Sequence, residues 1–306
     1  MVAMTKIDSR PTVGVVLSSY NGEKYIIKQI DSILNQTYRN IHLFIRDDGS
    51  SDNTAALIRS FENDERITCI YGENRGVIKS FYEATKVASR SSEYIAFSDQ
   101  DDYWLPNKIE RAVNLLEAES SHKPVLYCSE YLFCDENLKP FEKSRLNDGK
   151  INLARCLYEN KTSGNTILMN KTLTEMYLSS GCDHVSWHDW WIALLAYSLG
   201  TVVFDNEPTL LYRRTGSNVS PTGSSSFLLL KYRINYFLKS KHLDGIRQQI
   251  DKLGSLYGNQ MDSETYKLVS TFTSKARIAK AVYPASLRQK GIDELALRLL
   301  FLSGLL

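Results

Sequence analysis

The sequence lacks the patterns that mark membrane-spanning, secreted and zinc-finger proteins. No apolar run reaches the ~18 residues of a spanning helix, and the short polar start has no signal-peptide core. Cysteines are few, odd in number and without Cys-x-x-Cys spacing, so neither a zinc site nor a disulfide framework is indicated. They are Cys69, Cys128, Cys134, Cys156 and Cys182. These absences favour a reducing, cytoplasmic environment.

Two common nucleotide-binding fingerprints are also missing. Neither Gly-x-Gly-x-x-Gly nor Gly-x4-Gly-Lys-Ser/Thr follows the first predicted strand, over residues 13–20, which disfavours a Rossmann dinucleotide site and a P-loop. No internal repeat is present. The chain has 306 residues, long enough for one large α/β domain or for a domain of ~200 residues with an appendage.

Charge is unevenly distributed along the chain. From Ser225 to the end there are 13 Lys and Arg against 6 Asp and Glu, a local charge of +7. The preceding residues carry 24 against 29, a charge of −5, so the net charge of +2 hides an acidic body and a basic end. Such an end suggests an anionic partner such as a membrane surface, although a solvated helical face explains it as well.

Strand-like and helix-like segments alternate over the first 120 residues. Short apolar, β-branched runs predict strands over residues 13–20, 41–46, 67–71 and 94–97. Helical spacing of apolar residues follows each of them, over residues 23–34, 54–61, from 77, and 108–120. This order predicts βαβ units, and therefore an α/β fold with a mostly parallel central sheet flanked by helices.

The second half of the chain is less regular. Strands are predicted over residues 125–129, 201–204 and 209–212, a loop over 135–150, and an apolar helix over 192–199. Gly, Ser and Pro between residues 216 and 226 predict a hinge or flexible loop, and only helical patterns follow it. We therefore expect a catalytic domain over residues 1–222 and a helical C-terminal extension over residues 223–306.

Polar clusters follow four of the predicted strands. Ligands of parallel sheets bind at the carboxyl ends of strands, so these clusters are expected on one edge of the sheet. They are Ser19-Tyr20-Asn21, Asp47-Asp48, Asn74-Arg75-Gly76 and Asp99 to Asp102. Four independent solvated loops would explain their shared position poorly.

The last cluster places three carboxylates within four positions. Asp99, Asp101 and Asp102 repel one another unless a cation or a group of donors neutralises them. Oxygen-only ligands at such a corner suit Mg²⁺ or Mn²⁺. The alternative is a solvated acidic turn in which Asp102 caps the helix that follows.

Taken in order, these motifs resemble those of family 2 glycosyltransferases with a GT-A fold, and within them bacterial rhamnosyltransferase-type enzymes of cell-surface polysaccharide assembly. The similarity extends over residues 12–220. It rests on Ser19-Tyr20-Asn21-Gly22 with Gln36-Thr37, Asp47-Asp48-Gly49-Ser50-Ser51-Asp52, Glu73-Asn74-Arg75-Gly76, Asp99-Gln100-Asp101-Asp102, His188-Asp189-Trp190-Trp191 and Tyr212-Arg213.

The resemblance implies roles for the residues of the first half. Asp47 and Asp48 would read the nucleobase and ribose, because a carboxylate accepts the ring N–H of uracil or thymine; an ordinary Asp-Gly turn is the alternative. Asp99 and Asp101 resemble an Asp-x-Asp pair that holds Mn²⁺ or Mg²⁺ against the donor diphosphate, with Asp101 the more direct ligand. The remaining nucleotide-binding residues would be Ser19, Tyr20, Asn21, Asn74 and Lys79.

Asp189 would be the general base that deprotonates the acceptor hydroxyl. Tryptophans around it would supply apolar walls that raise its pKa and flat faces that stack on sugar rings. The alternative is that Asp189 caps the apolar helix, and His188 is the fallback base. Donor-sugar and acceptor contacts would come from Gly164, Asn165, Trp187, His188 and Trp190.

Arg213 or Arg214 would hold the diphosphate. The chain departs from the family pattern just beyond this pair, where related enzymes often carry a His and this chain has Thr215. The metal then has one protein ligand fewer, or an arginine neutralises part of the charge.

The resemblance predicts an inverting, metal-dependent transferase that uses dTDP-L-rhamnose and a lipid-linked saccharide at the inner face of the plasma membrane. A UDP-hexose donor remains open, as do a nucleotidyltransferase or sugar-nucleotide hydrolase and a non-catalytic sugar-nucleotide or polysaccharide binding module. The basic C-terminal region would make peripheral membrane contact, pack on the catalytic domain or form a homo-oligomer. No nucleic-acid partner is expected.

Overall fold

The computed structural model describes residues 10–119, 122–214 and 240–306. Nine strands of this part form one mixed sheet in the order β3-β2-β1-β4-β8-β6-β9-β5, and β7 pairs with the outer half of β6. The strands are β1 (Val13–Ser19), β2 (Ile41–Asp47), β3 (Ile67–Tyr71), β4 (Tyr94–Ser98), β5 (Tyr103–Trp104), β6 (Val125–Cys134), β7 (Pro140–Lys143), β8 (Leu168–Asn170) and β9 (Thr201–Arg213).

The sheet has a parallel half and a mixed half. Strands β3, β2, β1 and β4 are parallel neighbours, and Val13 pairs with Ile41 on one side and Tyr94 on the other. The short antiparallel strand β8 then separates β4 from β6, which runs parallel to β9. The four predicted polar clusters therefore follow strands whose carboxyl ends share one edge, as expected.

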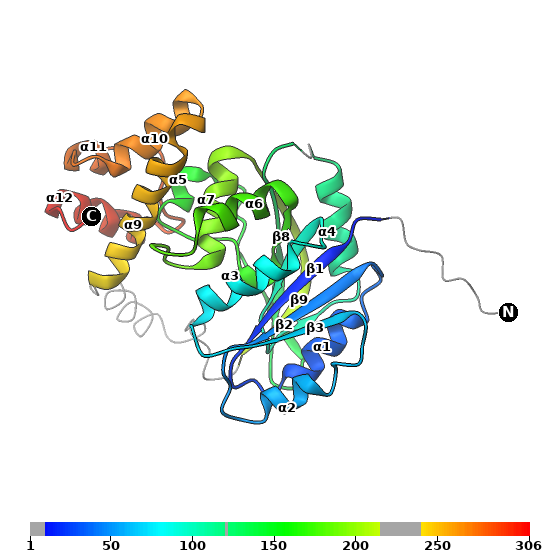
Figure 1. Ribbon diagram of the computed structural model, residues 1–306. Helices are drawn as coiled ribbons and strands as arrows, with labels where there is room; N and C mark the ends of the chain where they lie inside the picture. Colours follow the sequence, from blue (N-terminus) through cyan, green and yellow to red (C-terminus); the bar gives the residue numbers. More distant parts are fainter. Residues whose placement is uncertain (1–9, 120–121, 215–239) are drawn as a thin grey trace.

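Helices cover both faces of the sheet (Figure 1). One face packs on α1 (Ile26–Leu34), α2 (Thr54–Arg59) and α4 (Lys108–Glu117). The other packs on α3 (Val77–Ala88), α5 (Leu153–Cys156), α6 (Lys171–Ser180) and α7 (His188–Leu199). Parallel strands buried on both faces need apolar side chains on both, which is why β1 reads as a continuous apolar run.

Several elements differ from the sequence prediction. The two strands predicted over 201–212 are one strand, β9, which carries an irregularity where Ser129 pairs with Asp205 but Glu130 with Pro208. The predicted loop over 135–150 contains β7, and α6 was not predicted. Asn170, a residue type that favours the N-cap position, marks the start of α6 in the sequence. Its side chain accepts a hydrogen bond from the Leu173 N–H at 3.0 Å.

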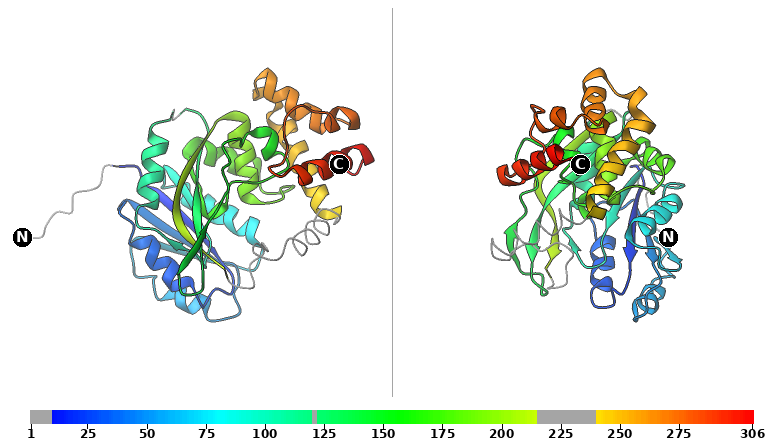
Figure 2. Two further views of the ribbon diagram at one scale, coloured as in Figure 1. Left: turned by 180° about the vertical axis from the view of Figure 1, so that it is seen from behind. Right: turned by 90° about the vertical axis from the view of Figure 1, so that its left-hand side faces the viewer.

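The C-terminal helices share the core of the α7 face. They are α9 (Ser240–Tyr257), η2 (Gly258–Gln260), α10 (Ser263–Thr273), α11 (Arg277–Ala281) and α12 (Gly291–Ser303). Leu253 and Phe301, both fully buried, belong to the same apolar cluster as Trp191 of α7. Figures 1 and 2 show the helices beside α5 and α7, away from α1 and α2. The predicted hinge over 216–226 and the domain boundary after residue 222 lie outside the described residues. None of the described helices is long and apolar enough to cross a membrane.

Candidate active site

Hydrogen bonds join the polar loops at the carboxyl edge of the sheet. Gln100, after β4, accepts hydrogen bonds from Ser19 Oγ at 2.8 Å and from the Tyr20 N–H at 2.9 Å. Its Nε2 donates to the Tyr20 carbonyl at 3.1 Å. A Cβ on Gly22 would lie 2.3 Å from Gln100 Oε1, so the glycine allows the two loops to approach closely. This role of Gln100 was not predicted from the sequence, where its place between two acids of the motif is the only signal.

Asn21 connects the first loop to the loop after β2. Its backbone lies in the left-handed region, with φ of 51°, which asparagine tolerates better than most residues. The Asn21 N–H donates to Ser50 Oγ at 2.9 Å, and Asn21 Oδ1 accepts the Ser51 N–H at 2.8 Å. Ser50 in turn donates through its N–H and hydroxyl to Asp47. The expected neighbours Asn21 and Asp47 therefore lie in one network.

The buried Asp48 side chain connects the end of β2 to the loop before α3. It forms an ion pair with Arg46, whose side chain is also buried. Its oxygens accept the Arg75 N–H at 3.0 Å and the Gly76 N–H at 2.9 Å. Of the two predicted nucleobase readers, Asp48 thus holds the rim together, whereas Asp47 makes fewer contacts.

Three other predicted nucleotide-binding residues are exposed near this edge. Tyr20 is 47% exposed, and Asn74 accepts the Gly76 N–H at 3.2 Å. Lys79, in the first turn of α3, is exposed and close enough to Cys182 for its charge to oppose the burial that raises the pKa of that thiol. Tyr20, Asn74 and Lys79 are therefore accessible to a ligand.

The acidic cluster shares one electrostatic environment with Asp189. Burial, then the Asp101 carboxylate and then that of Asp189 raise the pKa of Asp99 to about 7. Burial also raises the pKa of Asp101, and the Arg213 guanidinium opposes this rise. Asp99, just after β4, therefore lies close enough to both Asp101 and the distant Asp189 of α7 for their charges to oppose its ionisation.

Asp102 turns away from this group into the protein. It is 1% exposed and accepts a hydrogen bond from the Asn165 side chain. Burial, reinforced by Asp101 and Asp99, raises its pKa well above the usual range, and the buried Lys108 opposes the rise. The alternative that Asp102 caps the next helix is wrong, because the N-cap of α4 is Asn107.

Asp189 lies in the first turn of α7. Its Oδ2 accepts the Gly164 N–H at 3.1 Å and its Oδ1 the Trp190 N–H at 2.7 Å. Burial raises the pKa of Asp189 to about 6 despite these hydrogen bonds. The N-cap of α7 is Trp187, so the alternative that Asp189 occupies the cap is wrong.

The aromatic side chains around Asp189 are mostly part of the core. Trp190 is 4% exposed and its indole N–H donates to the Cys156 carbonyl, so the expected stacking of its ring on a sugar is wrong. His188 is buried and stacks on Phe81 with ring centroids 4.3 Å apart. Burial lowers the pKa of His188 to about 3, which makes it a poor base and leaves no exposed face for a sugar. Trp187 is half-buried and remains available.

The short helix η1 (Gly164–Thr166) connects the acidic cluster to Asp189. Asn165, 1% exposed, binds Asp102 through its amide nitrogen and accepts the Ser163 hydroxyl at 2.8 Å. Gly164, one residue earlier, donates to Asp189. Both predicted residues of this segment therefore hold carboxylates of the site in place.

Gly164→Ala is expected to lower kcat about tenfold while the protein still folds. The added Cβ would lie 3.1 Å from His188 Nε2 and 3.3 Å from Asp189 Cβ, tighter than ordinary contacts. Displacing a catalytic group by a fraction of an ångström costs rate more than stability. Steady-state kinetics with a melting curve test this. Gly291→Ala is the control, because nothing lies within 4 Å of the added Cβ; equal kcat in both variants would contradict the role of Gly164.

The Arg213 side chain binds the backbone of the acidic loop. It is 1% exposed; its Nε donates to the Asp101 carbonyl at 2.9 Å, its Nη1 donates to the Glu136 carbonyl, and the guanidinium lies 4.4 Å from the Tyr25 ring centroid. Arg214 lies over the Phe133 ring at 3.8 Å. Thr215, where a His was expected, lies outside the described residues.

The oxygen donors of this edge fit a divalent cation. The Asp101 carboxylate raises the pKa of Asp99, and a bound cation would favour the ionised form of both groups. In the described parts of the chain no three His, Cys, Asp or Glu side chains form an all-protein metal cage. Mg²⁺ and Mn²⁺ sites commonly use one or two carboxylates and complete the shell with substrate phosphates, which matches this pair.

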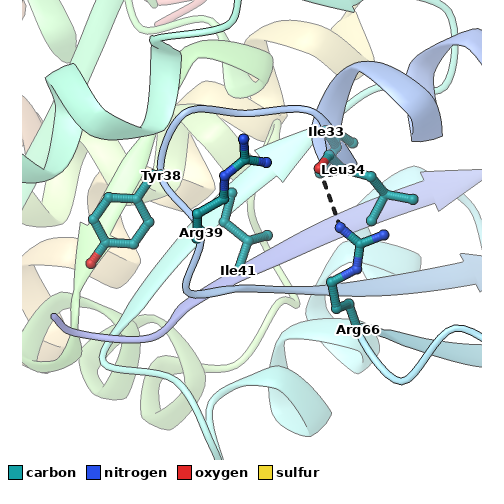
Figure 3. A pocket seen from close by; sticks show the side chains of 6 residues that line it. All are labelled: Ile33, Leu34, Tyr38, Arg39, Ile41 and Arg66. Atoms are coloured by element: carbon teal, nitrogen blue, oxygen red, sulfur yellow. Dashed lines mark hydrogen bonds between the residues drawn. The ribbon is translucent and has the colours of Figure 1, made fainter. Parts of the chain in front are cut away.

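A small cavity of about 20 Å³ lies elsewhere, near the amino ends of β2 and β3 (Figure 3). Ile33, Tyr38, Ile41 and Arg66 line it, and Arg66 donates to the Leu34 carbonyl at 3.3 Å. Its volume suffices for about one water molecule. It lies at the opposite end of the sheet from the acidic cluster and is not part of the candidate site.

The sequence is similar to known glycosyltransferases. The family model described as Glycosyl transferase family 2 matches residues 14–168. The dTDP-rhamnosyl transferase RfbG of Shigella flexneri is 25% identical over 94% of this chain and 99% of its own. The uncharacterized glycosyltransferase RP339 of Rickettsia prowazekii is 27% identical over 64% of this chain and 62% of its own, so the chain spans about three fifths of that relative. The β-1,3-glucosyltransferase WfaP of Escherichia coli, described as using UDP-Glc, is 37% identical over 35% of this chain and 42% of its own.

Solved structures share the fold at low identity. Staphylococcus aureus TarS 1–349 in complex with UDP-GlcNAc is 15% identical, with a TM-score of 0.61 over 96% of this chain and 82% of its own. The mannosyltransferase PcManGT of Pyrobaculum calidifontis, in complex with GDP-Man and Mn²⁺, is 16% identical, with a TM-score of 0.54 over 97% and 86%. The expected GT-A fold is thereby confirmed.

Proposed function

Because the chain belongs to glycosyl transferase family 2, we propose that it transfers a sugar from a nucleoside diphosphate sugar to a hydroxyl of a saccharide acceptor. The observation that carries the proposal is the convergence of Asp99, Asp101 and Asp189, whose pKa values are all raised, at the carboxyl edge of the sheet. Clustered carboxylates with raised pKa values are typical of active sites.

The roles divide according to the contacts of each residue. Asp99 and Asp101 would hold Mn²⁺ or Mg²⁺ together with the donor diphosphate, and such a cation would supply Lewis-acid stabilisation of the leaving nucleoside diphosphate. The nucleotide lies over the loops of Ser19 to Asn21 and Asp47, with the exposed Tyr20, Asn74 and Lys79 at its border. Asp48 and Arg213 act mainly by holding these loops, although a diphosphate contact by Arg213 or Arg214 remains part of the proposal.

Asp189 is the general base. Its carboxylate takes the proton of the acceptor hydroxyl while the oxygen attacks the anomeric carbon, and the C–O bond to the diphosphate breaks on the opposite face. One displacement with one base inverts the anomeric configuration. Held by Gly164 N–H and Trp190 N–H, the Asp189 carboxylate has a fixed orientation toward the site.

The donor is dTDP-L-rhamnose in this proposal. Support comes from the S. flexneri rhamnosyl transferase, which is similar over nearly the full length of both chains. A UDP-hexose is the alternative, supported by the E. coli glucosyltransferase over a shorter segment. The proposed acceptor is a lipid-linked saccharide, supported by the diphosphoundecaprenol acceptor in the name of the E. coli relative. The proposed site of action is the cytoplasmic face of the membrane, in polysaccharide synthesis.

A donor panel tests this function. The full chain is incubated with Mn²⁺, a lipid-linked saccharide acceptor and dTDP-L-rhamnose, UDP-glucose, UDP-GlcNAc or GDP-mannose, and released nucleoside diphosphate and modified acceptor are quantified together. We expect kcat/KM for dTDP-L-rhamnose to exceed that for the others at least 100-fold, since a pocket that binds sugar hydroxyls rejects donors that leave its polar groups unpaired. Preference for a UDP-sugar would replace the donor assignment. Binding without transfer from any donor would favour a non-catalytic binding module.

A further inference from the structure

Helix α12 leaves an aliphatic stripe exposed. Four apolar side chains recur at intervals of three, four and three residues, which places them within about 80° of one another around a helix. Each is at least half exposed, up to 75% for the first: Ile292, Leu295, Leu299 and Leu302. Leu297 and Phe301, on the opposite side, are fully buried in the core. The stripe therefore faces away from the protein.

Helix α11, which packs beside α12, and its C-cap residue also expose apolar side chains. Ile278 and Val282, one helical turn apart, are 71% and 70% exposed. Arg298 of α12 holds the two helices together by donating to the Ala281 carbonyl at 3.0 Å and the Tyr283 carbonyl at 2.6 Å. We call the six side chains of the stripe and of α11 the α11–α12 apolar face. Figure 1 shows both helices at the outer margin of the molecule.

The chain segment that carries this face is mainly basic. Residues 274–306, all described, contain two acids, and both are engaged internally. Asp293 is buried, and Glu294 accepts the Arg288 N–H at 2.7 Å and the Arg298 Nε–H at 2.7 Å. Lys275 and Lys290 are exposed and lie just before α11 and α12 in the chain, so positive charge lies at the start of both helices that carry the apolar groups.

We propose that the α11–α12 apolar face rests on an anionic lipid bilayer. Aliphatic side chains bordered by lysines match the apolar boundary and the negative headgroups of such a surface. A symmetric contact with a second copy would bring the same lysines together, and it would lack the Tyr, Trp and Arg anchors typical of protein interfaces. Because no described helix can span a membrane, the contact is peripheral. This inference goes beyond the proposed function, because docking requires no sugar transfer.

Vesicle flotation tests the proposal without involving the chemistry. The full chain is floated with phosphatidylcholine vesicles containing 30% phosphatidylglycerol and with phosphatidylcholine alone, with neither nucleotide nor acceptor present. We expect binding to the anionic vesicles that weakens in high salt. Leu295→Ser with Leu299→Ser should reduce the partition coefficient by about 100-fold or more, since each buried leucine contributes more than a factor of about ten. Lys275→Gln with Lys290→Gln should reduce it about 25-fold, fivefold for each charge.

Leu256→Ser is the matched control, because Leu256 is an exposed leucine of α9 outside the face. It should bind vesicles as the parent protein does. Protein that stays in the aqueous phase with anionic vesicles would overturn the proposal. So would equal binding of the Leu295/Leu299 variant, or a dimer that this variant converts to monomer in light scattering while vesicles bind neither. Nucleotide binding, measured separately by thermal shift, reports on the proposed function independently.

Discussion

Asp189→Asn is expected to lower kcat for sugar transfer by about 10²–10⁴-fold, the range typical of a positioned general base. Asparagine keeps the shape of the side chain and one oxygen for the Gly164 or Trp190 N–H, so the first turn of α7 should persist. It cannot take a proton from the acceptor. Nucleotide affinity and melting temperature should change little, because in the proposed mechanism the Asp189 carboxylate acts on the acceptor hydroxyl and not on the nucleotide. Single-turnover kinetics with saturating donor measure the loss.

The control for this prediction is Asp183→Asn, which removes an exposed carboxylate from the loop before α7. It should leave kcat unchanged. The same turnover in the Asp189→Asn protein and in the parent would remove Asp189 from the chemistry. A fall in nucleotide affinity equal to the fall in kcat would mean that Asp189 binds the donor and is not the base.

The pH profile gives a second readout of Asp189. Burial raises the pKa of this carboxyl to about 6, above its usual range, and only the deprotonated form can accept a proton. The kcat/KM of the parent protein should therefore fall as pH decreases through about 6 and level off above it. The Asp189 carboxylate also raises the pKa of Asp99, so ionisation of Asp99 can contribute to the same limb. Its disappearance in Asp189→Asn would identify the contribution of the base.

Local sequence patterns were enough to predict part of the fold and of the site. Strands β1 to β4 and the polar clusters after them were predicted because apolar runs and turns are local signals. The edge they share follows from parallel pairing alone. Asp189 was placed near a helix start by the apolar pattern of α7, although the cap itself is Trp187.

The contacts that shape the site could not be predicted in this way. Gln100 binds the loop of Tyr20 across 80 residues, Asn165 binds Asp102 across 63, and Arg213 reaches the Asp101 carbonyl across 112. The first pair depends on β1 lying beside β4 and the other two on the order β4-β8-β6-β9, and no local pattern specifies either arrangement. The exposure of the tryptophans was misjudged for the same reason, because C-terminal helices and α5 complete the core around α7.

Asp101→Asn is expected to abolish metal-dependent donor binding while leaving the free protein as stable as before or more so. Buried like charges destabilise the fold, as the raised pKa values of Asp99 and Asp101 indicate, so removing one relieves repulsion. The Arg213 Nε donates to the Asp101 carbonyl, so this backbone contact survives the substitution. A residue whose role was structural would lose stability instead. Melting curves of the free proteins separate the two roles.

The ligand readout uses the nucleotide found in the donor panel, with Mn²⁺ or with EDTA. For the parent protein, Mn²⁺ and nucleotide at ~100 Kd should add about 2.7 kcal/mol of stability, and EDTA should remove most of it. The Asp101→Asn protein should show little shift under either condition and should lose transfer by at least 10²-fold, since the cation supplies several kcal/mol of charge stabilisation. Asp31→Asn, an exposed carboxylate of α1, is the control and should behave as the parent does. Full nucleotide binding and turnover in EDTA would contradict the metal assignment, and the arginines near the acidic loop would then be the groups that neutralise the diphosphate.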